Sequence, residues 1–187
     1  DINGMSSSKL SGALPAISGA ALTGITSAGK AHNLVINGAM RVAQRGTSST
    51  TSGIHTVDRI GCDFGGADEN PTQEQVDVAA GTTPYSLGFR KAFKITNGNQ
   101  TSGAGASDYV RTDYKIEAQD VATSGWNYTS SSSNITLSFW VKSSVSKDFN
   151  FLIHTTDGTA KLYPMTTGTL SADTWTKVTK TIPGVST

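Results

Sequence analysis

The feature that most constrains the fold is a strict two-residue alternation in residues 135–142. Four large apolar residues alternate there with polar or aromatic ones, in the order Ile-Thr-Leu-Ser-Phe-Trp-Val-Lys. This period places the apolar side chains on one face of a β-strand. Further strands are expected at residues 57–64, 73–78, 88–96, 109–118, 149–153, 160–166 and 175–182. Short strands at this spacing, with no convincing amphipathic helix between them, predict an all-β sandwich.

The composition agrees with a strand-rich protein of low charge. The chain has 23 Ser, 26 Thr and 20 Gly, and only 16% of its residues are charged, against a usual fraction of about 25%. Thr favours strands, whereas Gly and Ser favour turns. A net charge of +1 argues against a nucleic-acid partner, because phosphate binding needs a basic surplus. No apolar run is long enough to span a bilayer, so we expect no membrane insertion.

The residues that usually carry catalysis or bind metals are few and scattered. Cys62 is the one cysteine, which excludes an intrachain disulfide, and we expect it to be a buried apolar side chain. None of the three histidines lies at the sequence spacing that is typical of metal ligands. Asp113 and Glu117, the best acid pair, would lie ~13 Å apart along one strand face, too far for glycoside cleavage. We therefore expect no cofactor, no metal and no enzymatic activity.

Residues 1–32 differ from the rest of the chain, since they lack aromatic residues and carry three formal charges. Aliphatic residues followed by small ones recur in them, and the candidate assembly residues are Leu10, Leu14, Ile17, Leu22 and Ile25. Gly and Pro make a continuous helix costly here. Two readings remain: a disordered linker, or an extended stalk that orders with copies of itself or on another protein.

Several segments carry a resemblance to a known family. Residues 33–46, Asn-Leu-Val-Ile-Asn-Gly-Ala-Met-Arg-Val-Ala-Gln-Arg-Gly, followed by Val-Asp-Arg-Ile at 57–60, resemble the opening of a domain common in bacteriophage tail fibres and related virion proteins. Ile-Thr-Leu-Ser-Phe-Trp-Val-Lys-Ser at 135–143 and Thr-Trp-Thr-Lys-Val-Thr at 174–179 are similar to jelly-roll carbohydrate-binding modules of secreted glycosidases. The repeat in residues 1–32 resembles the linkers that precede such domains in phage fibres.

The resemblance implies a jelly-roll β-sandwich over residues 33–187, preceded by an extended attachment segment over residues 1–32. It also implies a non-enzymatic tail-fibre subunit on the surface of a phage particle, expected to be a trimer, which contacts other virion proteins through residues 1–32 and contributes to recognition of host-surface polysaccharide. In this family further strands follow the Ile-Pro-Gly of residues 182–184, so we expect the sequence to be a piece of a longer chain. A capsid-attached head fibre or decoration protein, and a secreted carbohydrate-binding module, remain as alternatives.

The candidate glycan-binding residues combine aromatic rings with hydrogen-bonding groups. An aromatic face stacks on a sugar ring, while nearby polar groups bind its hydroxyls. Each candidate also has a structural alternative: a plug under the sandwich for Trp126, core packing for Trp140, and a surface ion pair for Arg111 with Asp113. We also expect Trp175 to belong to the core. The candidates are Trp126, Tyr128, Tyr109, Arg111, Asp113 and Trp140.

Overall fold

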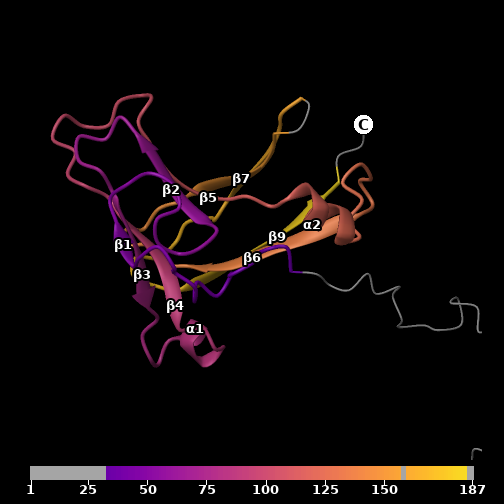
Figure 1. Ribbon diagram of the computed structural model, residues 1–187, viewed down its shortest axis with the longest axis horizontal. Coiled ribbons are helices and arrows are strands. Elements are labelled where there is room, and N and C mark those ends of the chain that lie inside the picture. Colours follow the sequence, from indigo (N-terminus) through magenta and orange to yellow (C-terminus); the bar gives the residue numbers. More distant parts are fainter. Residues whose placement is uncertain (1–32, 157–158, 185–187) are drawn as a thin grey trace, which may run out of the picture.

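The computed structural model of this protein describes residues 33–156 and 159–184 (Figure 1). The five candidate assembly residues between Leu10 and Ile25, and the hairpin turn expected at Asp157 and Gly158, lie outside the described residues. The strands are β1 (Ser48–Ser49), β2 (Ile60–Gly65), β3 (Thr72–Asp77), β4 (Lys91–Thr96), β5 (Tyr109–Tyr114), β6 (Asn134–Val141), β7 (Asn150–Thr155), β8 (Lys161–Thr166) and β9 (Thr176–Pro183). Two short helices, α1 (Thr83–Ser86) and α2 (Ala118–Thr123), lie between them.

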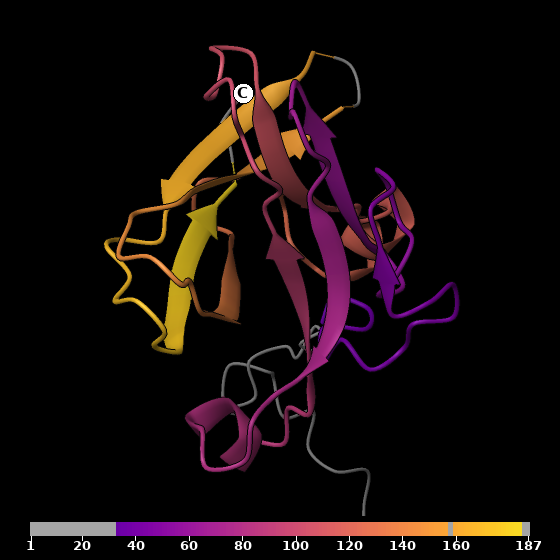
Figure 2. The same cartoon turned by 90° about the vertical axis from the view of Figure 1, so that its left-hand side faces the viewer.

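All strand pairs are antiparallel. Strands β2 to β9 form two blocks of four, and in each block the first and last strands pair with each other. In the first block β2 pairs with β5 around the hairpin β3–β4, and in the second β6 pairs with β9 around the hairpin β7–β8. In each block the fourth strand returns beside the first, while the two strands between them pair with each other in a separate sheet, which β1 joins in the first block. The two blocks face each other (Figure 2). The all-β sandwich expected from the sequence is confirmed.

The alternation in residues 135–142 forms β6 as expected, and its apolar face turns inward. Phe139 lies opposite Val178 of β9, and its ring meets that of Phe151 edge to face, with ring centroids 5.3 Å apart. Ile135 lies opposite the buried Ile182 at the other end of the pair. The buried apolar residues of the described chain are Val57, Ile60, Cys62, Val78, Leu170, Val178 and Ile182. The expected burial of Cys62 is confirmed, and this burial raises the pKa of its thiol.

Residues 33–59 form a strap that has little strand structure of its own. The apolar residues at 34–36 and 40–42 lie in turns and irregular chain. Asn37 adopts a left-handed conformation (φ 59°), and its side-chain amide bonds to both the N–H and the C=O of Val42. It also donates to the carbonyl of Asp58, whose carboxylate accepts from the N–H of Gln44. The segment that resembles the phage-fibre opening is therefore one hydrogen-bonded unit.

Two glutamines of β3 attach this strap to the sheet. The Gln73 side chain is 1% exposed, and its amide donates to the carbonyls of Thr51 (2.6 Å) and Gly53 (3.0 Å). Its carbonyl accepts from the buried hydroxyl of Thr56. Gln75 donates to the carbonyl of Met40 at 2.6 Å. These side chains add to the short backbone pairing of the strap, in which β1 pairs with β3 and Gly53 with Cys62.

Several segments differ from the expectations, and β2 and β4 each begin three residues later than expected, at Ile60 and Lys91. The strand expected over residues 109–118 ends at Tyr114, and Glu117 precedes α2, so it shares no strand face with Asp113. Trp175 was expected in the core but is only half-buried, with the ammonium of Lys142 5.7 Å from its ring centroid. β9 begins one residue later, at Thr176.

Replacing Gln73 by Leu is expected to lower the free energy of unfolding by about 2–4 kcal/mol, because it strands two carbonyls and a hydroxyl in a buried site. Urea denaturation followed by circular dichroism measures the change. The control Gln119→Leu, on the exposed side of α2, should cost less than ~0.5 kcal/mol. Equal effects of the two substitutions would show that the strap does not depend on Gln73.

Candidate functional site around Trp126

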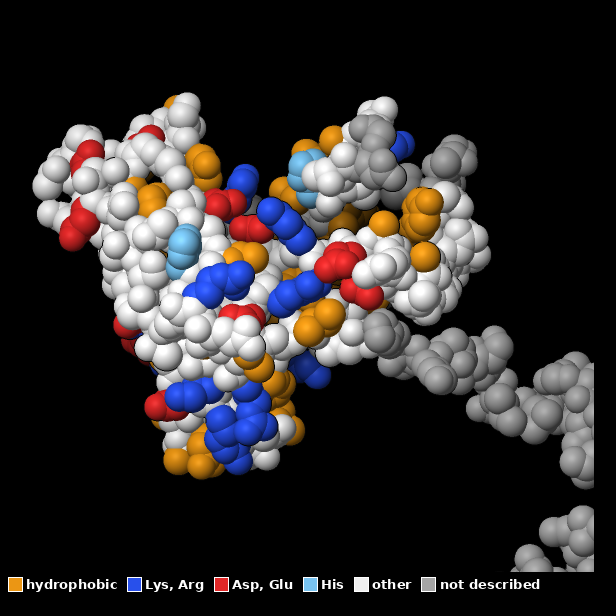
Figure 3. Space-filling view, viewed as in Figure 1, with side chains coloured by type: hydrophobic (Ala, Val, Ile, Leu, Met, Phe, Trp, Pro, Cys, Tyr) orange, Lys and Arg blue, Asp and Glu red, His pale blue; other side chains and the backbone are white. Residues whose placement is uncertain are grey.

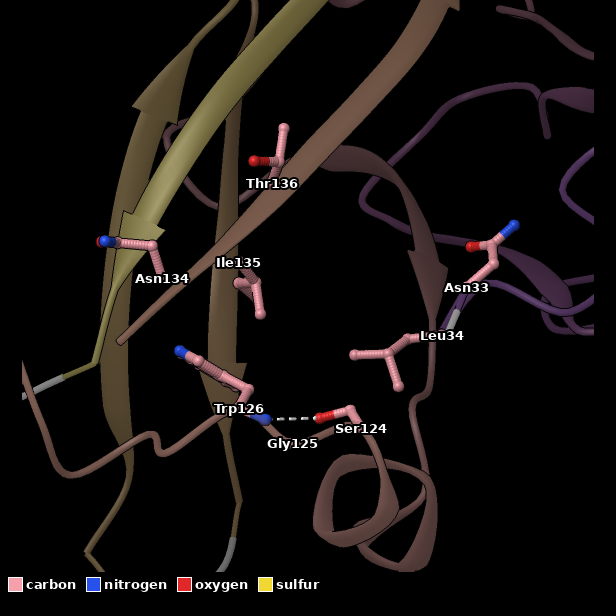
Figure 4. A pocket seen from close by; sticks show the side chains of 8 residues that line it. All are labelled: Asn33, Leu34, Ser124, Gly125, Trp126, Asn134, Ile135 and Thr136. Atoms are coloured by element: carbon pink, nitrogen blue, oxygen red, sulfur yellow. Dashed lines mark hydrogen bonds between the residues drawn. The ribbon is translucent and has the colours of Figure 1, made fainter. Parts of the chain in front are cut away.

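A pocket of about 470 Å³ opens where the loop after α2, the start of β6 and the beginning of the described chain meet (Figure 4). Leu34 and Ile135 project toward its centre, and Trp126 bounds it on the side away from Leu34. The lining residues are Asn33, Leu34, Ser124, Gly125, Trp126, Asn134, Ile135 and Thr136. Each of these eight side chains is uncharged, so the pocket combines an indole and two aliphatic groups with amides and hydroxyls.

The end of α2 shapes the lower wall of the pocket as drawn in Figure 4. The Ser124 hydroxyl donates to the carbonyl of Val121, and its oxygen accepts from the backbone N–H of Trp126 at 3.1 Å. Gly125 follows the helix with a left-handed φ of 80°, a conformation that glycine adopts without steric cost. This turn directs the chain from the helix into the loop that carries Trp126.

The indole of Trp126 is held in place at both ends. Its Nε1–H donates to the carbonyl of Ser133 at 3.2 Å, and its ring meets Tyr128 edge to face at a centroid distance of 6.3 Å. The next backbone N–H, of Asn127, donates to the Ser133 hydroxyl. Trp126 is half-buried, whereas Tyr128 is 59% exposed. The structure thus brings together the aromatic pair that the sequence analysis singled out.

Gly184 supports this loop from the end of β9. Its N–H donates to the carbonyl of Ser133 at 2.8 Å. A Cβ atom at position 184 would lie 2.5 Å from the carbonyl oxygen of Ser130 and 2.6 Å from that of Asn127. Only glycine permits so close an approach of two backbones. Gly184, which directly follows β9, therefore also holds the Trp126 loop in place.

The second candidate group lies on β5, away from the pocket. Tyr109, Arg111 and Asp113 share one face of this strand, opposite Gly65, Asp63 and Gly61 of β2. The expected surface pair of Arg111 with Asp113 is not the one found, because Arg111 reaches across to Asp63 at 3.2 Å. Burial raises the pKa of Asp63, but hydrogen bonds from Arg111 and Ser52 outweigh it and hold the pKa below its usual value.

The groups on the β5 face are largely engaged with one another. The Arg111 guanidinium carbon lies 5.2 Å from the centroid of the Tyr109 ring. The side chains of Tyr109 and Asp113 lean over Gly65 and Gly61, where a Cβ would approach them to within 2.9 and 2.7 Å. Arg111 thus engages both Asp63 and Tyr109, and this face lies beside the charged side chains in the hollow between the two lobes of the molecule (Figure 3).

Trp140, the sixth candidate, joins neither group. It lies on the outer face of β6, directly opposite Lys177 of β9, and is half-buried. The structural alternative of core packing does not describe it, since the apolar neighbours Phe139 and Val141 occupy the inner face.

Two of the carboxylates that could be considered for catalysis have structural partners. Glu117 pairs with Arg59 at 3.0 Å. Asp68 accepts from the backbone N–H and the hydroxyl of Ser102, and these hydrogen bonds lower its pKa. Within residues 33–156 and 159–184 no group of three His, Cys, Asp or Glu residues is arranged to hold a metal ion.

Sequence reasoning found Trp126 but missed the rest of the pocket wall. Ser124 and Gly125 carried a local signal, since Ser-Gly after a short helix is typical of a helix end. Asn33 and Leu34 carried none, because they reach the pocket only through tertiary contacts: the Tyr114 hydroxyl donates to the carbonyl of Leu34 and accepts from the N–H of Ile36. Asn134, Ile135 and Thr136 were expected only as strand residues.

Comparison with protein-family models, with curated proteins and with solved structures yields no match to this chain. Among the described residues no helix is long and apolar enough to cross a membrane. The fold defines this protein as an all-β sandwich, and the function of its site has to follow from the residues that form it.

Replacing Gly184 by Ala is expected to displace the Trp126 loop and to lower the free energy of unfolding by about 1–3 kcal/mol, because the added methyl group meets backbone rather than flexible side chain. Denaturation and acrylamide quenching of tryptophan fluorescence measure both effects. Gly38→Ala is the control, since its Cβ would meet a Val35 methyl group at 3.3 Å and would come no closer than 3.5 Å to a backbone atom. A Gly184→Ala protein with unchanged stability and quenching would contradict the supporting role of Gly184.

Proposed function

We propose that this protein is a non-enzymatic component of a phage fibre that binds a glycan on the host surface through the Trp126 pocket. The observation that carries the glycan part is the pocket itself. Its volume of about 470 Å³ lies within the range of about 300–1,000 Å³ typical of small-molecule sites. Its indole, bordered by uncharged amides and hydroxyls, matches the mixed apolar and hydroxylated surface of a sugar ring.

The pocket is favoured over the β5 face because more of its bonding capacity is free for a ligand. A ligand on β5 would have to compete with the Arg111–Asp63 ion pair and with the stacking of Arg111 on Tyr109. In the pocket, the Nε1–H of Trp126, the Ser124 hydroxyl and the Asn33 side-chain oxygen are committed within the protein. The side chains of Asn134 and Thr136 form none of the hydrogen bonds found among the described residues, so they can bond a ligand. Rigid support of the ring also favours binding, since little side-chain freedom is lost when the ligand docks.

The virion part of the proposal is supported by the segment that resembles phage-fibre domains. Residues 33–46 and 57–60 join in the single unit built by Asn37 and Asp58, so the resemblance involves residues that act together. The aliphatic repeat of residues 1–32 would then supply attachment and self-assembly. A head fibre or decoration protein is the same proposal at another position on the particle.

Trp126→Ala is expected to weaken glycan binding about tenfold, because the loss of ring stacking and apolar contact amounts to about 1.4 kcal/mol. Binding to a panel of purified bacterial surface polysaccharides, measured by biolayer interferometry, checks this. Thr136→Arg provides a second test, since its long side chain should obstruct the rim of the pocket while leaving the indole in place. Tyr85→Ala, which removes a distant ring that stacks on Arg90, is the matched aromatic control.

Loss of binding in both pocket variants but not in the control is the expected result. A protein that binds no polysaccharide in the panel, or binds equally well with Thr136→Arg, would exclude the pocket as a glycan site.

Deletion of residues 1–32 is expected to convert a trimer into a monomer, because the candidate assembly residues from Leu10 to Ile25 are removed while the buried residues from Val57 to Ile182 remain. Light scattering of the intact chain and of a chain that begins at Asn33 gives both masses. A monomer in both cases would favour a solitary carbohydrate-binding module over a fibre subunit.

A further inference from the structure

The outer face of the β6–β9 pair is a ladder of small hydroxyl side chains that ends in a tryptophan and a lysine. The strand register places Thr136 opposite Thr181, Ser138 opposite Thr179, and Trp140 opposite Lys177. All of these residues except Trp140 are exposed. Directly opposed side chains of an antiparallel pair lie close together, so the face presents paired hydroxyls in a row. We call these six residues the hydroxyl strip.

The hydroxyl strip is continuous with the Trp126 pocket. Thr136, the first residue of the strip on β6, also lines the pocket, as does Asn134, which lies on the same strand face. From Thr136 to Trp140 the strand rises by ~13 Å. The strip therefore runs from the rim of the pocket, at Thr136, to Trp140, a length that suits several linked sugar units rather than one.

The charge of this surface is one-sided. The sequences of β6 and β9, NITLSFWV and TKVTKTIP, contain no Asp or Glu. Lys177 forms none of the ion pairs found within the described residues. Lys142, the next basic residue along the chain from β6, lies over the Trp175 ring. The ammonium beside Trp140 is thus available to an anionic group of a ligand that stacks on this indole.

We propose that the hydroxyl strip extends the Trp126 pocket into a site for a linear polysaccharide that carries carboxylates, with one uronate unit at Trp140 and Lys177. This inference rests on the proposed glycan-binding function and adds its extent and charge class. Ser and Thr hydroxyls bond the sugar hydroxyls along the ladder, and Lys177 pairs with the carboxylate of the unit on Trp140. Ring stacking contributes most of the affinity at that end, because exposed ion pairs contribute less than ~1 kcal/mol.

The experiment uses the intact chain and pairs of polysaccharides that differ only in charge. Each uronate-bearing polymer in the panel is compared with its carboxyl-reduced form, in which every uronic acid is the neutral hexose. Carboxyl reduction is expected to weaken binding about threefold to fivefold at low salt, and Lys177→Met should abolish that preference. Added salt should narrow the difference, because it screens an exposed charge pair.

Substitutions at the far end of the strip separate it from the pocket. Trp140→Ala and Thr179→Arg are expected to weaken binding of long oligosaccharides about tenfold while leaving binding of the shortest fragments unchanged. Thr166→Arg, on the exposed face of β8, is the control for an added bulky cation on a strand. Circular dichroism confirms that each variant is folded.

The outcomes distinguish this inference from the function on which it rests. Binding that depends on Trp126 but not on Trp140, on oligosaccharide length or on carboxyl reduction would overturn the hydroxyl strip and leave the pocket intact. Binding that depends on Trp140 but ignores carboxyl reduction and Lys177→Met would overturn the charge assignment. If no polysaccharide binds at all, both the proposed function and its extension fail.

Discussion

The first half of the molecule depends on the hydrogen bonds that the buried Gln73 side chain of β3 makes with the strap. Residues 33–59 are rich in Gly, Ser and Thr, and only Ser48 and Ser49 among them form a strand. Such a segment buries too little apolar surface to offset the entropy of ordering it. A buried amide with three partners and the Asn37–Asp58 unit provide the fixed points instead. Leu34, near the start of the strap, has its own anchor in the Tyr114 hydroxyl and forms one wall of the Trp126 pocket.

The loop that carries Trp126 is built in the same way. Its anchors are a Ser124 hydroxyl, the Ser133 carbonyl and hydroxyl, and the close approach of Gly184. A loop held by polar groups and backbone contact can surround a binding pocket without filling it, whereas a loop held by large apolar side chains would close the space. The low charge and high hydroxyl content of the chain therefore serve a structural role, because polar side chains hold both the strap and the Trp126 loop. The same composition leaves hydroxyl groups on the surfaces proposed to bind a sugar.

The sequence predicted those parts of the structure whose signal is local. The strict alternation of residues 135–142 defined β6, its inner face and the outward position of Trp140, and the isolated Cys62 was expected to be buried. What failed depended on register or on tertiary contacts. No local pattern shows that Asp63 rather than Asp113 lies beside Arg111, since that follows from the pairing of β2 with β5. The place of Leu34 in the pocket wall likewise follows from a tertiary contact, because the Tyr114 hydroxyl donates to its carbonyl.

The division of charge between the two surfaces bears on how such a protein discriminates among ligands. On β5 the charges neutralise each other, as Arg111 does with Asp63, and so stabilise a surface rather than recruit a ligand. On β6 and β9 a lysine stands beside an indole without a carboxylate on either strand. One exposed ion pair adds little affinity to a single site. Several copies on one particle, however, would multiply a small preference through effective concentration. Each chain could therefore discriminate only weakly between charged and neutral glycans while the whole assembly discriminates strongly. In this way the charge of the hydroxyl strip is linked to the assembly proposed for residues 1–32.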